Sequence, residues 1–263
     1  MPKVGNIPST APYLSLGTYG GLPFWPGGLT LLAAAPGVGK TSCLAQIVHQ
    51  AAASNLPAAL GCYEHTSDEL KFRLQLQAEA SVAGPHVPAD PEIAAAELAK
   101  SSEAALLALS DRVDTLRAVE EILIEDYDFP AHGPALLAMD YLQRIPSVGL
   151  TGMTPEERQA GEAAAGLREL ARRRGWAVIA AAALKAESFE GTARLSSLLG
   201  DERVSYEADR VLLMERSGEV RDCGCVSLVV HTLKNRVGPA TSFRMEFWGA
   251  RFYPALNGEA GHE

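Results

Sequence analysis

One stretch constrains this chain more than any other: Ala33-Ala34-Ala35-Pro36-Gly37-Val38-Gly39-Lys40-Thr41-Ser42. The apolar run 29–33 before it predicts a buried strand, and residues 42–53 after it predict a helix. Gly37 and Gly39 allow the backbone to curl, so that its N–H groups converge on an anion at a helix N-terminus. The stretch therefore predicts a phosphate-binding loop, with Ala34 in place of the usual first glycine.

The expected ligand of this loop is a nucleoside triphosphate with Mg²⁺. Lys40 can reach the β- and γ-phosphates, and the Thr41 hydroxyl can ligate Mg²⁺. The residues expected to contact the nucleotide are Ala35, Pro36, Gly37, Val38, Gly39, Lys40, Thr41 and Ser42. A simple glycine-rich turn between a strand and a helix is the alternative, but such a turn does not require Gly-Lys-Thr at this place.

Two carboxylates follow predicted strands. Asp140 ends the apolar run 135–139, and Glu64 comes just after the strand predicted at 56–63. Because the carboxyl ends of parallel strands meet at one edge of a sheet, both side chains should lie near the phosphates. We expect Asp140 to support the metal and Glu64 to activate the attacking water. A surface glutamate that begins a loop is the alternative for Glu64.

Lys234 and Arg236 follow a late strand, predicted at 226–233, and precede a Gly-Pro turn. With a strand period of two, both side chains point the same way. Two cations projected together from a strand end could reach the γ-phosphate of a neighbouring subunit and stabilise charge in the transition state. The alternative is a solvated basic end of a hairpin.

The alternation of strands and helices predicts an α/β fold, in which helices cover both faces of a mainly parallel sheet. The last strands follow one another without helices, which predicts an antiparallel C-terminal part. Residues 92–125, rich in Ala, Leu and Glu, are expected to be helical. The expected organisation is an irregular lead-in (1–20), one ATPase domain (21–255) and a flexible tail (256–263).

Charge and composition narrow the range of partners. The net charge of −9 argues against broad, nonspecific nucleic-acid binding, although it allows a local basic surface. No apolar run approaches the roughly 20 residues needed to span a membrane, and the N-terminus has no signal-peptide pattern. We therefore expect a cytoplasmic protein without a membrane partner.

The cysteines do not predict a metal site. Cys43 and Cys62 lie among apolar residues and are expected to be small core residues. Cys223-Gly224-Cys225 lacks the second pair that a zinc site requires.

The order and spacing of these motifs, from about residue 17 to residue 253, resemble the ATPase domain of DnaB-type replicative helicases, a branch of the RecA-like fold. The most specific match is Asp140-Tyr141-Leu142-Gln143. The segment Lys234-Asn235-Arg236-Val237-Gly238-Pro239 is similar to the family element that carries an arginine finger. The other matching segments are Pro26-Gly27-Gly28-Leu29, Tyr63-Glu64-His65 followed by Arg73, and Tyr206-Glu207-Ala208-Asp209.

The resemblance implies an ATP hydrolase and a 5′–3′ DNA helicase that acts on single-stranded DNA during replication. Lys40 and Thr41 would bind ATP and Mg²⁺, Asp140 would support the metal, and Glu64 would be the general base. Lys234 and Arg236 would act across a subunit interface. The implied partners are further copies of the chain in a hexameric ring, single-stranded DNA and other replication proteins.

The chain departs from the family pattern in three ways. Ala182 and Ala183 stand where the family usually has a Ser-Gln pair, whose Gln senses nucleotide or DNA. The segment 185–210 holds more acidic than basic residues, although DNA affinity comes largely from phosphate neutralisation. The P-loop begins within the first 40 residues, so the family's N-terminal collar domain and linker helix are expected to be missing. The candidate DNA contacts are Arg144, Arg194 and Arg203.

Two alternatives to a helicase stay open. The first is a RecA-like ATPase that controls assembly or recombination without unwinding, which Ala183 and the acidic 185–210 segment favour. The second is an ATP-binding adaptor that loads another helicase. An adaptor that only binds ATP has no need of Glu64, whereas the motifs at Asp140 and Arg236 favour the helicase.

Overall fold

The computed structural model describes residues 14–15, 23–83, 92–93, 96, 105–109, 115–146, 156–189, 193–218, 225–248 and 251–254. The predicted tail, Cys223 and all of the predicted lead-in except β1 lie outside these residues. The strands are β1 (Leu14–Ser15), β2 (Pro23–Phe24), β3 (Leu29–Ala34), β4 (Ala58–Cys62), β5 (Ala105–Ala108), β6 (Leu136–Asp140), β7 (Ala177–Ala183), β8 (Arg210–Arg216), β9 (Val226–Asn235), β10 (Ser242–Trp248) and β11 (Arg251–Pro254). The α-helices are α1 (Lys40–Ala53), α2 (Ser67–Ala83), α4 (Leu116–Asp126), α5 (Glu156–Arg174) and α6 (Glu202–Glu207). Short 3-10 helices are η2 (Leu142–Arg144), η3 (Ala186–Ser188) and η4 (Leu195–Ser197).

One large sheet organises the described residues, with strand order β11-β10-β9-β8-β3-β7-β6-β4-β5. The strands from β8 to β5 in this order are parallel, and β9, β10 and β11 continue the sheet in antiparallel fashion. This topology confirms the predicted α/β class with a mainly parallel sheet and antiparallel C-terminal strands. A separate short sheet pairs β1 with β2.

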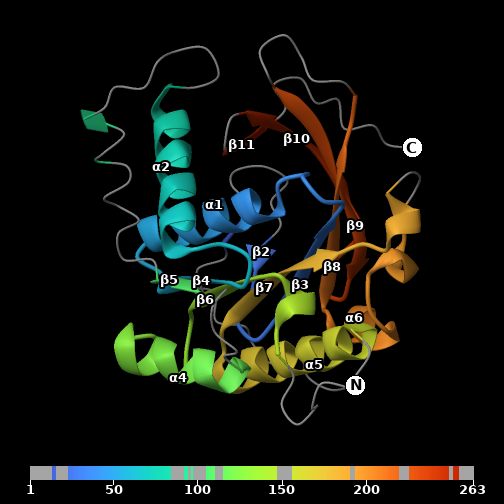
Figure 1. The fold of residues 1–263 in the computed structure, drawn as a ribbon, viewed down its shortest axis with the longest axis horizontal. Coiled ribbons are helices and arrows are strands. Elements are labelled where there is room, and N and C mark those ends of the chain that lie inside the picture. Colours follow the sequence, from blue (N-terminus) through green and yellow to red (C-terminus); the bar gives the residue numbers. More distant parts are fainter. Residues whose placement is uncertain are drawn as a thin grey trace.

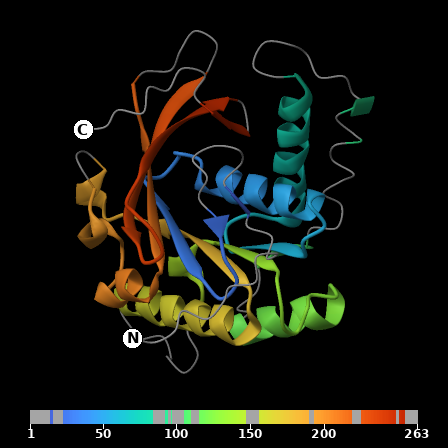
Figure 2. The same cartoon turned by 180° about the vertical axis from the view of Figure 1, so that it is seen from behind.

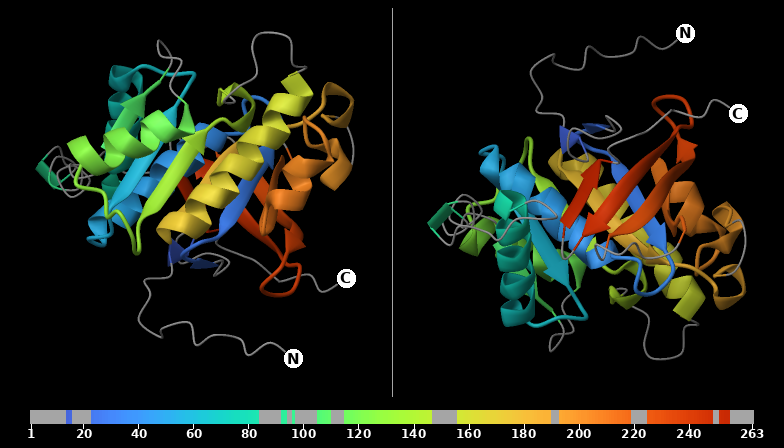
Figure 3. Two further views of the ribbon diagram at one scale, coloured as in Figure 1. Left: turned by 90° about the horizontal axis from the view of Figure 1, so that it is seen from below. Right: turned by 90° about the horizontal axis from the view of Figure 1, so that it is seen from above.

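Helices cover both faces of the parallel part. Figure 1 shows α4 and α5 on one side of the strands and α1 with α2 on the other, and the view from behind agrees (Figure 2). Seen from below and from above, α5 crosses one face of the sheet while α1, α2 and the last strands lie on the opposite side (Figure 3). None of the described helices is both long and apolar enough to cross a lipid bilayer.

The central strand β3 has one polar residue, Thr30, and is otherwise apolar, because both of its faces are covered. Leu29, Leu31 and Ala33 belong to the core cluster on the α4–α5 side, whereas Leu32 and Ala34 belong to the cluster on the α1 side. Successive side chains of a strand point to opposite faces, so a strand with helices on both faces buries every residue. All six residues of β3 are buried. The buried strand predicted before the phosphate loop is therefore confirmed.

The expectation of a helical stretch over residues 92–125 is wrong in its middle. Residues 105–108, with the sequence Ala-Leu-Leu-Ala, form β5, which pairs in parallel with β4 at the edge of the sheet. A short apolar run of this kind fits a helix or a strand, and the open edge of β4 decides for the strand. The later helix α4 begins only after Thr115, whose hydroxyl accepts a hydrogen bond from the Ala118 N–H at 3.3 Å.

The start of α2 fixes the turn that follows β4. The Thr66 N–H donates to the Glu69 carboxylate at 2.8 Å, and the Glu69 N–H donates to the Thr66 hydroxyl at 3.3 Å. This reciprocal pair is a capping box. It holds the residues between β4 and α2, including Glu64 and His65, next to the end of the sheet.

Candidate nucleotide-binding site

The predicted strand–loop–helix forms from β3, residues 35–39 and α1. Gly37 and Gly39 adopt positive φ values of 74° and 110°, in the left-handed region that favours glycine. At Gly39, a Cβ atom would also lie 3.0 Å from the Phe252 ring. Both backbone conformation and space therefore explain glycine at this position.

Lys40 and Thr41 begin α1 and point toward the loop and β6. The Lys40 ammonium donates to the carbonyl oxygens of Ala34 and Ala35, at 2.9 and 3.2 Å. Burial lowers the pKa of Lys40, while the carboxylates of Asp140 and Glu64 act in the opposite direction. The Thr41 hydroxyl donates to the Asp140 carboxylate at 2.6 Å.

The ends of β4 and β6 bring the carboxylates together. Cys62 and Asp140 are partners in the parallel register, so Glu64 follows on the same edge of the sheet. Potential ligand atoms of Glu64, His65 and Asp140 all lie within 4.8 Å of one another. The Cys62 thiol lies 3.7 Å from the Asp140 carboxylate, and burial raises the pKa of Cys62 to about 12, so this thiol stays a neutral donor.

A cavity of about 550 Å³ opens over these residues. It is lined by Pro36, Gly37, Gly39, Lys40, Thr41, Ser42, Glu64, His65, Arg73, Leu76, Tyr141, Ala183 and Phe247. Its volume lies in the range of about 300–1,000 Å³ that small-molecule sites occupy. Of the residues expected to contact the nucleotide, Ala35 and Val38 instead line a neighbouring cavity of about 410 Å³, which Pro36 shares.

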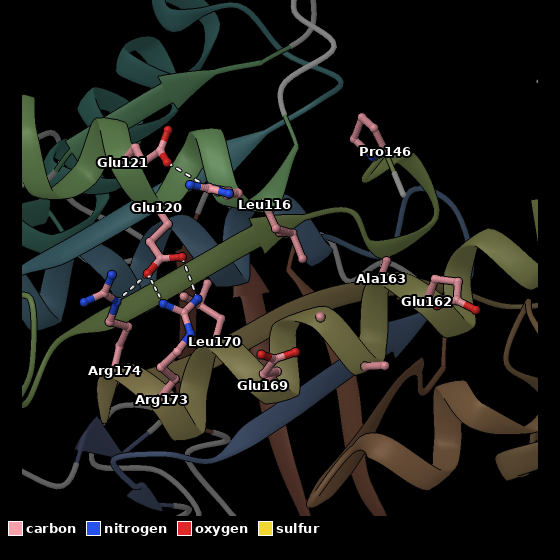
Figure 4. A pocket seen from close by; sticks show the side chains of 13 residues that line it. Leu116, Glu120, Glu121, Pro146, Glu162, Ala163, Glu169, Leu170, Arg173 and Arg174 are labelled. Atoms are coloured by element: carbon pink, nitrogen blue, oxygen red, sulfur yellow. Dashed lines mark hydrogen bonds and ion pairs between the residues drawn. The ribbon is translucent and has the colours of Figure 1, made fainter. Parts of the chain in front are cut away.

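A larger cavity, of about 630 Å³, lies between α4 and α5 (Figure 4). Ion pairs cross one part of it: Glu120 accepts two hydrogen bonds from Arg173, at 2.6 and 2.7 Å, and another from Arg174. Burial alone would raise the pKa of Glu120, but the hydrogen bonds from the two arginines hold it below its usual value. These ion pairs join α4 to α5.

Lys234 and Arg236 lie at the opposite end of the sheet from Lys40. The Arg236 N–H donates to the Asp209 carbonyl, and the Asp209 N–H donates to the carbonyl of Leu29, where β3 begins. The P-loop follows the other end of β3, roughly 16 Å away at about 3.3 Å per residue. The two cations therefore cannot reach the P-loop of their own chain.

In the isolated chain, both cations bind to their own protomer. Lys234 donates to the carbonyls of Ser205 and Tyr206, at 2.6 and 3.2 Å. Arg236 donates to the Tyr206 carbonyl at 2.6 Å and pairs with Asp209 at 3.3 Å. Burial lowers the pKa of Lys234, and the nearby Arg236 adds to this effect.

Comparison with protein families decides the relationship. A model of the DnaB-like helicase C-terminal domain matches residues 18–252, which is most of the chain. The chain belongs to this family. The family is one of helicases driven by ATP hydrolysis, and the resemblance seen in the motifs is confirmed. No curated protein sequence gives a match.

Solved structures agree on the fold. A DnaB-like replicative helicase, described with its interactions with primase, is 17% identical with a TM-score of 0.73, over 88% of this chain and 60% of that chain. A second solved structure, of an ATPase domain, is also 17% identical, with a TM-score of 0.72, over 88% of this chain and 86% of the other. The RadB recombinase is 19% identical with a TM-score of 0.58, over 92% and 99%. The chain thus spans about three fifths of the replicative helicase and shares its RecA-like fold.

The three arginines suggested as DNA contacts differ in their surroundings. Arg144 is exposed, with its Nε 3.2 Å from the Tyr141 hydroxyl, and Arg194 is exposed just before η4. Arg203 instead pairs with Asp201 at 2.8 Å and Glu162 at 2.5 Å, and hydrogen bonds from its guanidinium to these carboxylates raise its pKa. Arg203 therefore holds α5 and α6 together, whereas Arg144 and Arg194 remain candidates for contacts with DNA.

Two residues at the site were not anticipated. Arg216, at the end of β8, donates to the Gly37 carbonyl of the P-loop at 2.7 Å. Phe247 lines the cavity from β10 and packs on Phe252, with ring centroids 4.6 Å apart. The Gln46 side chain on α1 draws β11 close by hydrogen bonds with both backbone groups of Phe252, at 2.8 and 3.0 Å. In the sequence, the short spacing of the last strands indicated an antiparallel C-terminal part. It did not show that these strands would lie next to the P-loop.

Proposed function

We propose that this chain is the Mg²⁺-dependent ATPase motor of a ring-shaped DNA helicase that moves on single-stranded DNA. The observation that carries the proposal is the 2.6 Å hydrogen bond from the Thr41 hydroxyl to Asp140, next to a cavity lined by Lys40 and Glu64. A hydroxyl and a carboxylate supply the hard oxygen atoms that Mg²⁺ prefers beside a triphosphate. The donor set therefore fits the metal, which would neutralise charge on the β- and γ-phosphates.

The residues of the cavity divide the work between them. Lys40, now hydrogen-bonded to the Ala34 and Ala35 carbonyls, would turn to the phosphates, where its charge is needed. Backbone N–H groups around Gly37 and Gly39 would hold phosphate oxygens. Glu64 is exposed in the cavity and would accept a proton from the attacking water.

The second half of the site would come from a neighbouring copy. Lys234 and Arg236 face away from their own P-loop, so a head-to-tail contact can bring them to the next one. Exposed apolar side chains lie near the two regions that this contact would join. Tyr206 (70% exposed) and Val237 (59%) lie near the two cations in the sequence, and Phe72 (59%) is on α2, next to Arg73 of the cavity. In this proposal residues 21–255 form one ATPase domain. Repetition of the head-to-tail contact would close copies of this domain into a ring, a hexamer by family likeness.

ATP turnover of the purified protein, with and without single-stranded DNA, tests this function together with unwinding of a forked duplex. We expect DNA to stimulate turnover, 5′–3′ unwinding to follow, and Lys40→Ala to reduce both to background. Tight ATP binding without turnover in the parent would contradict the proposal and favour an adaptor that loads another helicase. If turnover and unwinding are observed, other replication proteins would be sought as partners of the assembled ring.

One observation favours a second function, an ATPase that controls assembly or recombination without unwinding. Ala183 lines the cavity with a methyl group, where the family usually has a polar sensor, and the 185–210 segment is rich in acid. Turnover that ignores DNA, in a protein that still oligomerises, would support this second function over the first.

A further inference from the structure

A buried carboxamide, that of Gln143, joins the nucleotide site to a second part of the chain. Gln143 follows Asp140 closely, in η2, and is 3% exposed. Its Oε1 accepts the Ala183 N–H at 3.1 Å, and its Nε2 donates to the Leu199 carbonyl at 2.8 Å. A carboxamide presents both a donor and an acceptor, so it satisfies both backbone groups at once, which a carboxylate or an alkyl group cannot do.

Gln143 binds at the base of two stretches, residues 184–189 and 193–199, here named the paired segment: Leu199 ends the second stretch, and Ala183 directly precedes the first. The Lys185 N–H donates to the Ser197 carbonyl, and the Leu199 N–H donates to the Ala183 carbonyl, both at 2.9 Å. An isolated bridge joins Leu184 and Leu198. Ala183 thus stands at the base of the paired segment and also lines the nucleotide cavity.

The paired segment also faces the P-loop across a cavity. Ala35, Pro36 and Val38 share their cavity of about 410 Å³ with Ser188 and Phe189. The paired segment therefore has two parts of the nucleotide site as neighbours. One is the P-loop, and the other is Ala183 together with Gln143, which follows β6 and Asp140. A shift of Ala183 or of Gln143 would therefore act on its base.

We infer that Gln143 is a positioning residue that transmits the state of the nucleotide site to the paired segment. The methyl group of Ala183 cannot form a hydrogen bond with a phosphate, but the N–H and C=O groups of the same residue are both fixed, one to Gln143 and one to Leu199. Nucleotide packed against Ala183 and metal held at Asp140 would therefore set the base of the paired segment through Gln143. This inference rests on the proposed function, because it takes the cavity to hold ATP.

The described part of the paired segment carries groups suited to single-stranded nucleic acid. Lys185 and Arg194 are cationic, and Phe189 is 45% exposed. Cations that follow a backbone and aromatic rings that stack on bases are the usual means of binding single strands. Gln143 would thereby couple ATP to DNA in place of the polar sensor that the family usually has where this chain has Ala182 and Ala183, at the end of β7.

Hydrogen exchange of the Lys185 and Leu199 amides tests this inference, measured with and without Mg²⁺ and a non-hydrolysable ATP analogue. In the parent protein, we expect the analogue to slow exchange at both amides. In Gln143→Met, which keeps the volume and loses the hydrogen bonds, exchange should be roughly tenfold faster and no longer depend on the analogue. Affinity for the analogue should change by less than about threefold.

Gln159→Met is the matched control, because Gln159 donates to the Ile145 carbonyl at 3.1 Å, next to η2, without an observed hydrogen bond to the paired segment. It should behave as the parent. Gln143→Asn keeps an uncharged carboxamide on a shorter side chain and should give an intermediate result if Gln143→Met proves too unstable to measure. As a second readout, stimulation of turnover by single-stranded DNA should fall toward one in Gln143→Met, with basal turnover retained.

Two results would overturn the coupling: an analogue effect in Gln143→Met as large as in the parent, or a parent whose paired segment ignores a bound analogue. Failure of the parent to bind the analogue at all would instead overturn the proposed function, and the coupling with it. Binding data on the parent therefore separate the two failures.

Discussion

The two ends of the central strand β3 differ in how complete they are. At its carboxyl end, Lys40, Thr41 and Glu64 line one cavity within a single chain, and the buried Asp140 accepts a hydrogen bond from Thr41. At its amino end, Lys234 and Arg236 have no phosphate to serve, and they bind the carbonyls of Ser205 and Tyr206 and the carboxylate of Asp209. Under the proposed function, one protomer would therefore carry two half-sites, and a neighbouring copy would complete each of them.

The largest loss of ATP turnover should come from a substitution at the amino end of β3. Arg236→Ala should lower ATP turnover of the assembled protein by about 10³-fold or more, because a trans-acting arginine stabilises the charge of the transition state. Nucleotide affinity of the isolated chain should not change, since Arg236 cannot reach its own P-loop. Steady-state turnover and equilibrium binding measure the two effects. Arg244→Ala, an exposed arginine on β10, is the control, and a normal rate in Arg236→Ala would remove the trans assignment.

A substitution at the carboxyl end of β3 should lower ATP turnover without weakening nucleotide binding. Glu64→Gln should reduce turnover by about 10²–10⁴-fold, the usual contribution of a general base, while it preserves the shape of the cavity and the binding of ATP. Single-turnover kinetics and nucleotide binding measure this separation. A loss of binding that matches the loss of rate would show that Glu64 holds the nucleotide instead of activating water.

A smaller effect separates the arginines suggested as DNA contacts. Arg194→Ala should weaken binding of single-stranded DNA a few-fold and reduce the salt dependence by about 0.7 in slope, the value for one lost phosphate contact. Arg203→Ala should instead lower thermal stability, because it removes ion pairs with Asp201 and Glu162. Titrations at several salt concentrations and a thermal melt distinguish the two. Equal loss of DNA binding in both variants would contradict the distinction.

The smallest effect on activity should come from the cavity between α4 and α5. Glu120→Gln should destabilise the fold by about 1–3 kcal/mol, because it weakens hydrogen bonds to two arginines, and leave turnover per folded molecule unchanged. The pKa of Glu120 is lower in the folded chain than usual, so the parent's advantage is present above the unfolded pKa and is lost as pH falls through the folded value. Denaturant unfolding at neutral and acidic pH measures it. An advantage that grows on acidification would contradict the ion-pair explanation.

Much of the carboxyl end could be predicted because its residues lie in short motifs that follow successive parallel strands. Lys40 and Asp140 needed only the rule that such strands end at one edge. Arg216 and Phe247 could not be predicted, since they come from the late strands, whose path depends on contacts such as that of Gln46 with Phe252. The strand β5 was missed because a short run of Ala and Leu does not choose between helix and strand until it meets the edge of β4.

The central claim, that each active site is shared by two protomers, is tested most directly by mixing Lys40→Ala with Arg236→Ala protein. Each variant alone should be inactive: the first has no working P-loop and the second has no finger. In mixed assemblies, the intact P-loop of an Arg236→Ala subunit can meet the intact Arg236 of a Lys40→Ala neighbour. We expect turnover in the mixture well above the sum of the two separate preparations, rising with protein concentration. Turnover equal to that sum, in mixtures shown to exchange subunits, would contradict the shared site.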